Sequence, residues 1–152
     1  MLGRATAQNG FTLVEVLIAI LVLAIGLLGL AMLQVEALKH STDAYYRTQA
    51  TMLAYEIVDR MRANSDAALN GDYISTTAPI TPETCGDTAS GCGSATALAR
   101  YDLSVWYQNL SQALPAVSAA PSTIALVGTQ ATVTINWGER GITKTRNWTI
   151  EL

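Results

Sequence analysis

Apolar residues are spread unevenly along the chain, and their spacing predicts segments of different kinds. From Val16 to Leu33 no residue is charged, and almost every one is Val, Ile, Leu, Ala, Met or Gly. Phe11 to Val14 extend this stretch on the other side of Glu15. Because an uncharged run of this length can cross a bilayer as a helix, we expect residues 11–33 to form a transmembrane segment.

The helical pattern continues beyond this run and becomes one-sided. Residues 34–64 contain no Pro or Gly, and Asp43 with Arg47 and Glu56 with Arg60 stand four residues apart, as ion pairs on a solvated helix do. Apolar side chains recur at spacings of three and four residues, at Tyr46, Ala50, Leu53, Ile57 and Met61. The pattern predicts one helix that runs unbroken out of the membrane and ends near Asn64.

Residues 65–152 are expected to form a globular head. Asn70-Gly71-Asp72 is a turn signal, and small and polar residues from there to Ser94 predict a surface loop region. Residues 100–114 predict a second, short helix that Pro115 terminates. Its apolar face carries Leu103, Trp106 or Tyr107, Leu110 and Leu114.

The C-terminal part, residues 122–152, predicts strands. Ile124–Val127, Ala131–Trp137 and Ile142–Ile150 are rich in β-branched and aromatic residues, and Gly138–Gly141 predicts a hairpin between the last two. A small antiparallel sheet can pack its apolar face, with Trp137 and Trp148, on the long helix. The expected fold class is α+β.

Charge and cysteine content narrow the possible partners and the compartment. The formal net charge is −3 and no Lys/Arg-rich run occurs, so we do not expect nucleic acid as a partner. Cys85 and Cys92 flank a short turn-rich loop and would pair as a disulfide in an exported domain. A reactive dithiol is the alternative interpretation.

The N-terminus does not have the order of an ordinary signal peptide. A secretory signal places its cleavage site after the apolar region. Here a hydrophilic leader, residues 1–10, ends at Gly10 and the sequence Phe11-Thr12-Leu13-Val14-Glu15 leads directly into the apolar helix. Cleavage behind Gly10 would therefore leave the helix attached to the head.

This sequence resembles the prepilin signature that type IV pilins share with the pseudopilins of type II secretion. The resemblance implies that prepilin peptidase cuts between Gly10 and Phe11 and methylates the new amine of Phe11. It also implies that Glu15, the fifth residue of the mature chain, acts in subunit assembly.

The chemistry of Glu15 can be argued independently. An ionised carboxylate within a membrane helix costs about 2.5 kcal/mol or more unless it has a partner or lies near the interface. In a staggered bundle, the amine of Phe11 from a neighbouring subunit could pair with Glu15 and set the register between subunits. The alternative is that Glu15 lies at the headgroup level of an ordinary anchor. Gly26 and Gly29 could allow close helix packing or local unwinding, or reflect ordinary membrane-helix composition.

Further segments resemble minor pilins of the PilV type. These segments are residues 45–50, 54–64, 102–106, 114–115 and 133–137, the last followed by Glu139-Arg140. Met32 stands where major pilins often have Pro, which also favours a minor pilin or pseudopilin. The resemblance implies a pilin-like α+β fold, anchoring in the bacterial inner membrane with the head in the periplasm, and later incorporation into a surface pilus.

The same resemblance implies a function as a minor pilin subunit. Such a subunit helps to prime pilus assembly at the tip complex and so supports adhesion and twitching motility. Its expected partners are other minor pilins, the major pilin, prepilin peptidase and a large tip adhesin. The alternatives are a minor pseudopilin of type II secretion, or a pilus-tip binding module that uses the Cys85–Cys92 loop.

No residue pattern predicts catalysis. His40 has no second His, Cys pair or carboxylate cluster at metal-ligand spacing, and we expect it to be a solvated helix residue. No nucleotide-binding glycine loop, G-x-S-x-G elbow or Cys/His arrangement occurs. We therefore expect neither an enzyme, a cofactor nor a metal; a membrane-anchored enzyme that keeps residues 1–10 is the remote alternative.

Overall fold

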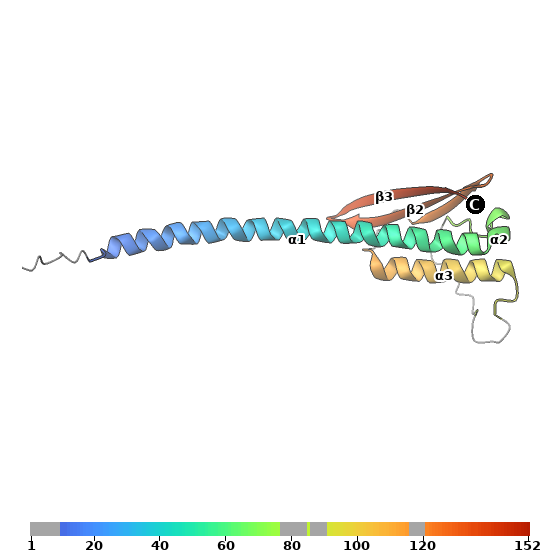
Figure 1. The fold of residues 1–152 in the computed structure, drawn as a ribbon, viewed down its shortest axis with the longest axis horizontal. Helices are drawn as coiled ribbons and strands as arrows, with labels where there is room; N and C mark the ends of the chain where they lie inside the picture. The colour runs from blue at the N-terminus through green and yellow to red at the C-terminus, as the bar shows by residue number, and fades with distance from the viewer. Residues whose placement is uncertain (1–9, 77–84, 86–90, 116–120) are drawn as a thin grey trace, which may run out of the picture. The chain divides into compact units, whose positions relative to one another are not determined.

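The computed structural model describes residues 10–76, 85, 91–115 and 121–152 (Figure 1). The elements in chain order are α1 (Leu13–Ala63), α2 (Ser65–Leu69), α3 (Ala95–Ala113), β1 (Thr123–Val127), β2 (Gln130–Glu139) and β3 (Ile142–Glu151). The strands form an antiparallel sheet in the order β1-β2-β3. This arrangement confirms the expected α+β, pilin-like fold.

The chain divides into two compact units, residues 1–42 and 43–152. The division falls within α1, between Thr42 and Asp43. In the first unit every described residue is exposed, so this part of α1 contributes nothing to a core within the chain. The second unit, called the head below, contains the sheet, α2, α3 and the rest of α1.

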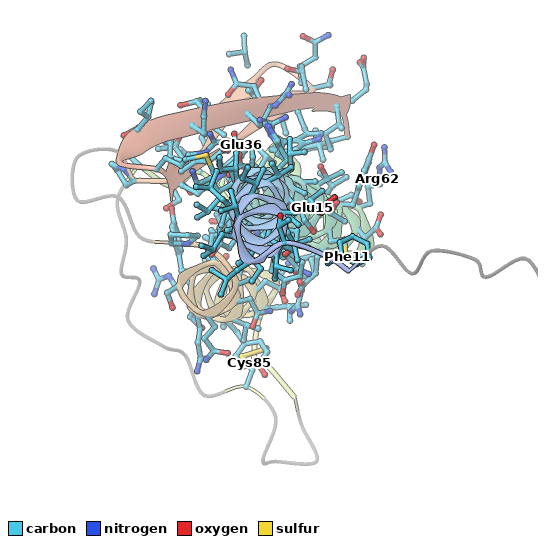
Figure 2. The ribbon with its side chains drawn as sticks, turned by 90° about the vertical axis from the view of Figure 1, so that its left-hand side faces the viewer. Phe11, Glu15, Glu36, Arg62 and Cys85 are labelled. Atoms are coloured by element: carbon cyan, nitrogen blue, oxygen red, sulfur yellow. A yellow bond between two sulfur atoms is a disulfide. The ribbon has the colours of Figure 1, made fainter. Side chains whose placement is uncertain are left out.

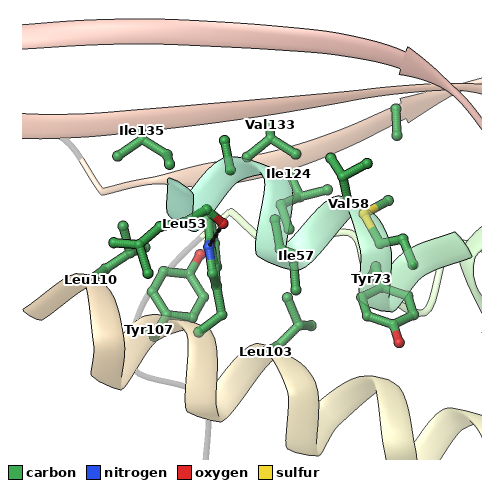
Figure 3. Close-up of a cluster of buried hydrophobic side chains, with 14 of the residues drawn as sticks. Leu53, Ile57, Val58, Tyr73, Leu103, Tyr107, Leu110, Ile124, Val133 and Ile135 are labelled. Carbon is green, nitrogen blue, oxygen red and sulfur yellow. Dashed lines mark hydrogen bonds between the residues drawn. The ribbon is translucent and has the colours of Figure 1, made fainter. Parts of the chain in front are cut away.

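The core of the head has three layers, and Figure 3 shows α1 between the sheet and α3. The expected apolar face of α1 is buried at Ala50, Leu53, Ile57 and Met61, and Tyr46 packs at its edge. From α3, Leu103, Trp106, Tyr107 and Leu110 are buried. From β2, Ala131, Val133, Ile135 and Trp137 are buried at alternate positions, as a strand with one covered face requires.

Trp106 rather than Trp148 is the second large aromatic side chain in the core. Its ring is fully buried, and its Nε1–H donates a hydrogen bond to the backbone oxygen of Leu53 at 2.9 Å. Trp148 on β3 is only partly buried. Trp137, as expected, is buried. The hydrogen bond thus ties α3 to α1 near the middle of the core.

The expected start of the second helix is wrong, for a local reason. The expected second helix is α3 in the structure, and it begins at Ala95 rather than Arg100. Ser94 caps it by accepting a hydrogen bond from the Ala97 N–H at 3.1 Å. The short helix α2 between Asn64 and the expected turn was not predicted, and within the expected surface loop Tyr73 is buried in the core.

The β2–β3 hairpin turn is tighter than expected. Glu139 pairs with Ile142 across the strands, so only Arg140 and Gly141 form the turn. Both have positive φ, 53° and 76°, as a two-residue type I′ turn requires. Gly at the second position adopts this conformation without steric cost, whereas Arg140 needs other contacts to hold it.

Ion pairs with Asp43 and Arg47 provide these contacts. The expected pairing of Asp43 with Arg47 on a solvated surface is wrong. Asp43 is buried and binds Arg140. Arg47 lies 3.4 Å from the Glu139 carboxylate instead. The hydrogen bond from Arg140 holds the pKa of Asp43 below its ordinary value. The hairpin turn is therefore fixed to α1 by two pairs.

A second polar cluster joins α1, α3 and the segment after α2. Arg60 lies 2.9 Å from Glu56, which confirms the expected pair, and 2.7 Å from the buried carboxylate of Asp102. The hydroxyl of Tyr73 donates to Asp102 at 2.6 Å. Burial, and then this hydrogen bond, raise the pKa of Tyr73 well above its ordinary value. Tyr73 therefore stays a neutral donor, and Asp102 is satisfied from two sides.

Trp106→Ala should lower the free energy of unfolding of the head by about 3–5 kcal/mol, because it leaves a cavity and removes the bond to Leu53. Trp148→Ala, at a partly buried position, is the matched control and should cost less than half as much. The measurement is chemical denaturation of the full chain in detergent, followed by near-UV circular dichroism. Equal losses for the two variants would contradict this description of the core.

The stability of the head should fall on acidification partly through Asp43. Its folded pKa lies below the unfolded value of about 3.9, so its contribution is complete above about pH 5 and is lost as pH falls through the folded pKa. Asp43→Asn should therefore be less stable than wild type at pH 7, and this difference should shrink toward pH 2. Asp59→Asn, at an exposed position, is the control and should follow wild type. A constant difference between Asp43→Asn and wild type from pH 7 to pH 2 would show that Asp43 does not make this contribution.

Candidate functional site

The candidate site is the start of α1, where a local hydrogen bond fixes the first helical residue. The backbone N–H of Glu15 donates to the Thr12 backbone oxygen at 3.1 Å and lies 3.3 Å from its hydroxyl oxygen. Thr12 and Glu15 have the Thr-x-x-Glu spacing of a capping box. The helix therefore begins at Leu13, directly after Phe11. The Thr12–Glu15 spacing is visible in the sequence alone and could have predicted this helix start.

Phe11 and Glu15 lie on the same side of the helix. Both line a shallow groove along α1, together with Val16, Ala19, Ile20 and Leu23. The lining is almost entirely apolar, and Figure 2 shows the Glu15 carboxylate beside this helix near Phe11. Glu15 is the single charged residue between Phe11 and Val35. The structure thus presents one carboxylate on an otherwise apolar surface, four residues from Phe11.

The length of the charge-free helix matches a bilayer. Among the described residues, α1 is long and apolar enough to cross a membrane. From Val16 to Val35 it rises about 30 Å at 1.5 Å per residue, the thickness of the hydrocarbon core. Glu36 ends this stretch and lies 3.3 Å from Lys39 and 3.3 Å from the ring of His40. The expected solvated position of His40 agrees with its exposed side chain.

Gly26 and Gly29 do not interrupt α1. Both lie within the continuous helix, and a Cβ atom at either position would meet open space. The surface beside them is therefore free for another helix to approach closely.

Cys85 and Cys92 form a disulfide, as expected. The Cys85 sulfur also lies 3.7 Å from the backbone oxygen of Ala97, which places this bridge beside the first turn of α3. Most of the loop that the bridge closes, and the leader before Gly10, lie outside the described residues. The binding role of this loop, one of the alternatives to the expected pilin function, stays a hypothesis.

Comparison with known protein families indicates the class of protein to which the chain belongs. The model of the prokaryotic N-terminal methylation motif matches residues 6–31, and a model described as type IV pilin Tt1218 matches residues 32–104. No curated protein and no solved structure matches the chain. Type IV pilins are structural subunits that assemble with other pilins, and the methylation motif marks substrates of prepilin peptidase. Together with the α+β fold, the two consecutive matches identify the chain as a type IV pilin-like subunit, a pilin or a pseudopilin.

Proposed function

We propose that this chain is a minor pilin of a type IV pilus. In this role it joins other minor pilins in the tip complex that primes assembly, and so supports adhesion and twitching motility. The observation that carries the proposal is the first unit of α1: an apolar helix that starts beside Phe11 and Glu15 and has no buried residue among those described. A helix that is apolar on all sides needs partners outside its own head.

Lipid is the first of these partners. We propose that prepilin peptidase cleaves between Gly10 and Phe11 and methylates the Phe11 amine, and that the head lies in the periplasm. The Cys85–Cys92 disulfide supports this location, because disulfides persist in oxidising compartments. In the membrane Glu15 lies at one end of the charge-free span, where a carboxylate can reach the interface at low cost.

Other pilin subunits are the second partner. When the helix leaves the lipid and enters a bundle, Glu15 is surrounded by apolar side chains and needs a positive charge. We propose that the amine of Phe11 from a neighbouring subunit supplies this charge, since it is positioned by the same helix start on every such subunit. The pair would set the axial register between subunits.

A minor pseudopilin of type II secretion is the second candidate function. The matched methylation motif is common to both systems and favours neither. The resemblance to PilV-type minor pilins in residues 45–64 and in the C-terminal strands favours the pilus. The proteins with which the subunit assembles would distinguish the two.

The N-terminal peptide, isolated from membranes of cells with and without an active prepilin peptidase, should differ in mass. With the peptidase we expect the chain to begin at Phe11 and to carry one added methyl group on its amine. Without the peptidase the leader should remain attached at Gly10. Retention of the leader in both strains would contradict the proposed processing.

Glu15→Gln tests assembly in the same experiment. This variant keeps the shape of the side chain but loses its charge, so it should be cleaved behind Gly10 and recovered from sheared pili at least about tenfold less, which corresponds to 1.4 kcal/mol. Glu36→Gln, at the other end of the span, is the matched control and should assemble normally. Normal recovery of Glu15→Gln would exclude the proposed pairing.

A further inference from the structure

The strand β3 leaves one edge of the sheet open. β1 and β3 lie at the two edges of the sheet, and the edges differ. The edge of β1 is partly covered, because Ser75 and Ile124 exchange backbone hydrogen bonds of 2.9 and 3.0 Å. Among the described residues no strand pairs with the outer edge of β3, from Ile142 to Glu151. β3 pairs with β2 over its whole length without a bulge, so its outer edge is long and regular.

The register of the hairpin determines which backbone groups of β3 point outward. Glu139 and Ile142 flank the two-residue turn, so they bond to each other, and every second pair after them does the same. The 3.0 Å bond from the Leu152 N–H to the Thr129 backbone oxygen continues this alternation at the far end. The residues between these pairs direct their N–H and C=O groups away from β2: Thr143, Thr145, Asn147, Thr149 and Glu151. An extended chain can bond to such a row along its whole length.

Two cations lie along this edge. Lys144 pairs with Trp137 across the strands and Arg146 with Ile135, so both cations are on the side of the sheet that faces α1. In the described part of the chain neither forms an ion pair. The other side of β3 is neutral apart from Glu151. Cations that point inward at a strand edge disfavour pairing with any chain that offers no opposite charge.

A second copy of β3 is therefore a poor occupant of this edge. In the antiparallel registers that pair most of two β3 strands, Arg146 of one copy lies opposite or diagonal to Arg146 of the other. Like charges at such positions destabilise the pairing. A chain with carboxylates at these positions gains from the same arrangement, so the charges favour an acidic strand from a different protein.

We propose that the outer edge of β3 accepts an extended segment of another protein, which adds a strand to the sheet and carries Asp or Glu opposite Lys144 and Arg146. The backbone of this segment bonds to the outward N–H and C=O groups and supplies affinity. Its carboxylates neutralise the two cations and supply selectivity. The surface belongs to the sheet and involves no part of α1, so the inference applies to a pilin and to a pseudopilin alike and does not rest on the proposed function.

Binding of synthetic peptides to the full chain, purified in a neutral detergent, tests the charge preference. The probe is a fluorescent peptide with blocked ends and the length of β3 in which Thr and Glu alternate, and the control peptide has Lys in place of Glu. Wild type should bind the Glu peptide at least about tenfold more tightly than the Lys peptide. The double variant Lys144→Glu with Arg146→Glu should reverse this preference. If wild type binds neither peptide, or does not prefer the Glu peptide, the proposal is wrong.

Amide hydrogen exchange, followed by NMR, distinguishes strand addition from charge attraction alone. The outward amides of Thr145, Asn147 and Thr149 should exchange at least about tenfold more slowly when the Glu peptide is bound. The amides of Arg146 and Trp148 bond to β2 already and should change less. Binding that leaves exchange at the outward amides unchanged would show that no strand is added, and would overturn the proposal.

A proline at the edge provides an independent readout. Asn147→Pro removes one outward N–H and no bond to β2, as an edge strand tolerates, and should weaken binding of the Glu peptide at least about tenfold. Asn147→Thr keeps this N–H and is the matched control, which should bind like wild type. Both variants should keep the near-UV circular dichroism spectrum of wild type. Undiminished binding by Asn147→Pro would contradict the proposed strand addition.

Discussion

One helix must satisfy two different environments along an unbroken run of 51 residues, and the rest of the structure follows from this constraint. Before Asp43, every described residue of α1 is exposed, and from Val16 to Leu33 the helix carries no charge and is almost entirely apolar. From Asp43 onward, one side of α1 is buried by its own head and the other side stays exposed. The first part therefore depends on lipid or on other subunits, whereas the second part provides the central layer of a small folded unit. No flexible linker of Gly or Pro separates them, since residues 34–64 contain neither.

Within the head, the sheet and α3 are attached to α1 by polar contacts spread along the helix. Asp43 of α1 binds Arg140 in the hairpin turn. Two further contacts join α1 to α3: the Leu53 carbonyl accepts a hydrogen bond from Trp106, and Arg60 binds Asp102. Between these contacts lies the apolar core, which supplies most of the stabilisation. The sheet and α3 are therefore each fixed directly to the part of α1 that belongs to the head.

Local periodicity explains which parts of this structure could be predicted from sequence. The apolar run, the buried face of α1 and the alternation in β2 repeat over many residues, so each is visible in a short window. The ion pair between Asp43 and Arg140 joins residues 97 positions apart, and no local pattern reports such a partner. The short helix α2 and the buried Tyr73 were missed because small residues around them resemble a loop. The spacing of Thr12 and Glu15 and the cap at Ser94 are local signals, so both helix starts could be predicted from the sequence.

If α1 anchors the chain as proposed, its stretch from Val16 to Val35 lies in lipid and the chain enters water near Glu36. A cysteine-accessibility measurement tests it most directly, since the wild-type chain has no free thiol. Leu23→Cys and Ala37→Cys would each be treated with a membrane-impermeant maleimide, first in membranes and then in detergent. Leu23→Cys should be labelled only after detergent is added, whereas Ala37→Cys should be labelled in both conditions when the head side of the membrane is accessible. Equal labelling of the two positions in intact membranes would show that this part of α1 does not lie in the bilayer.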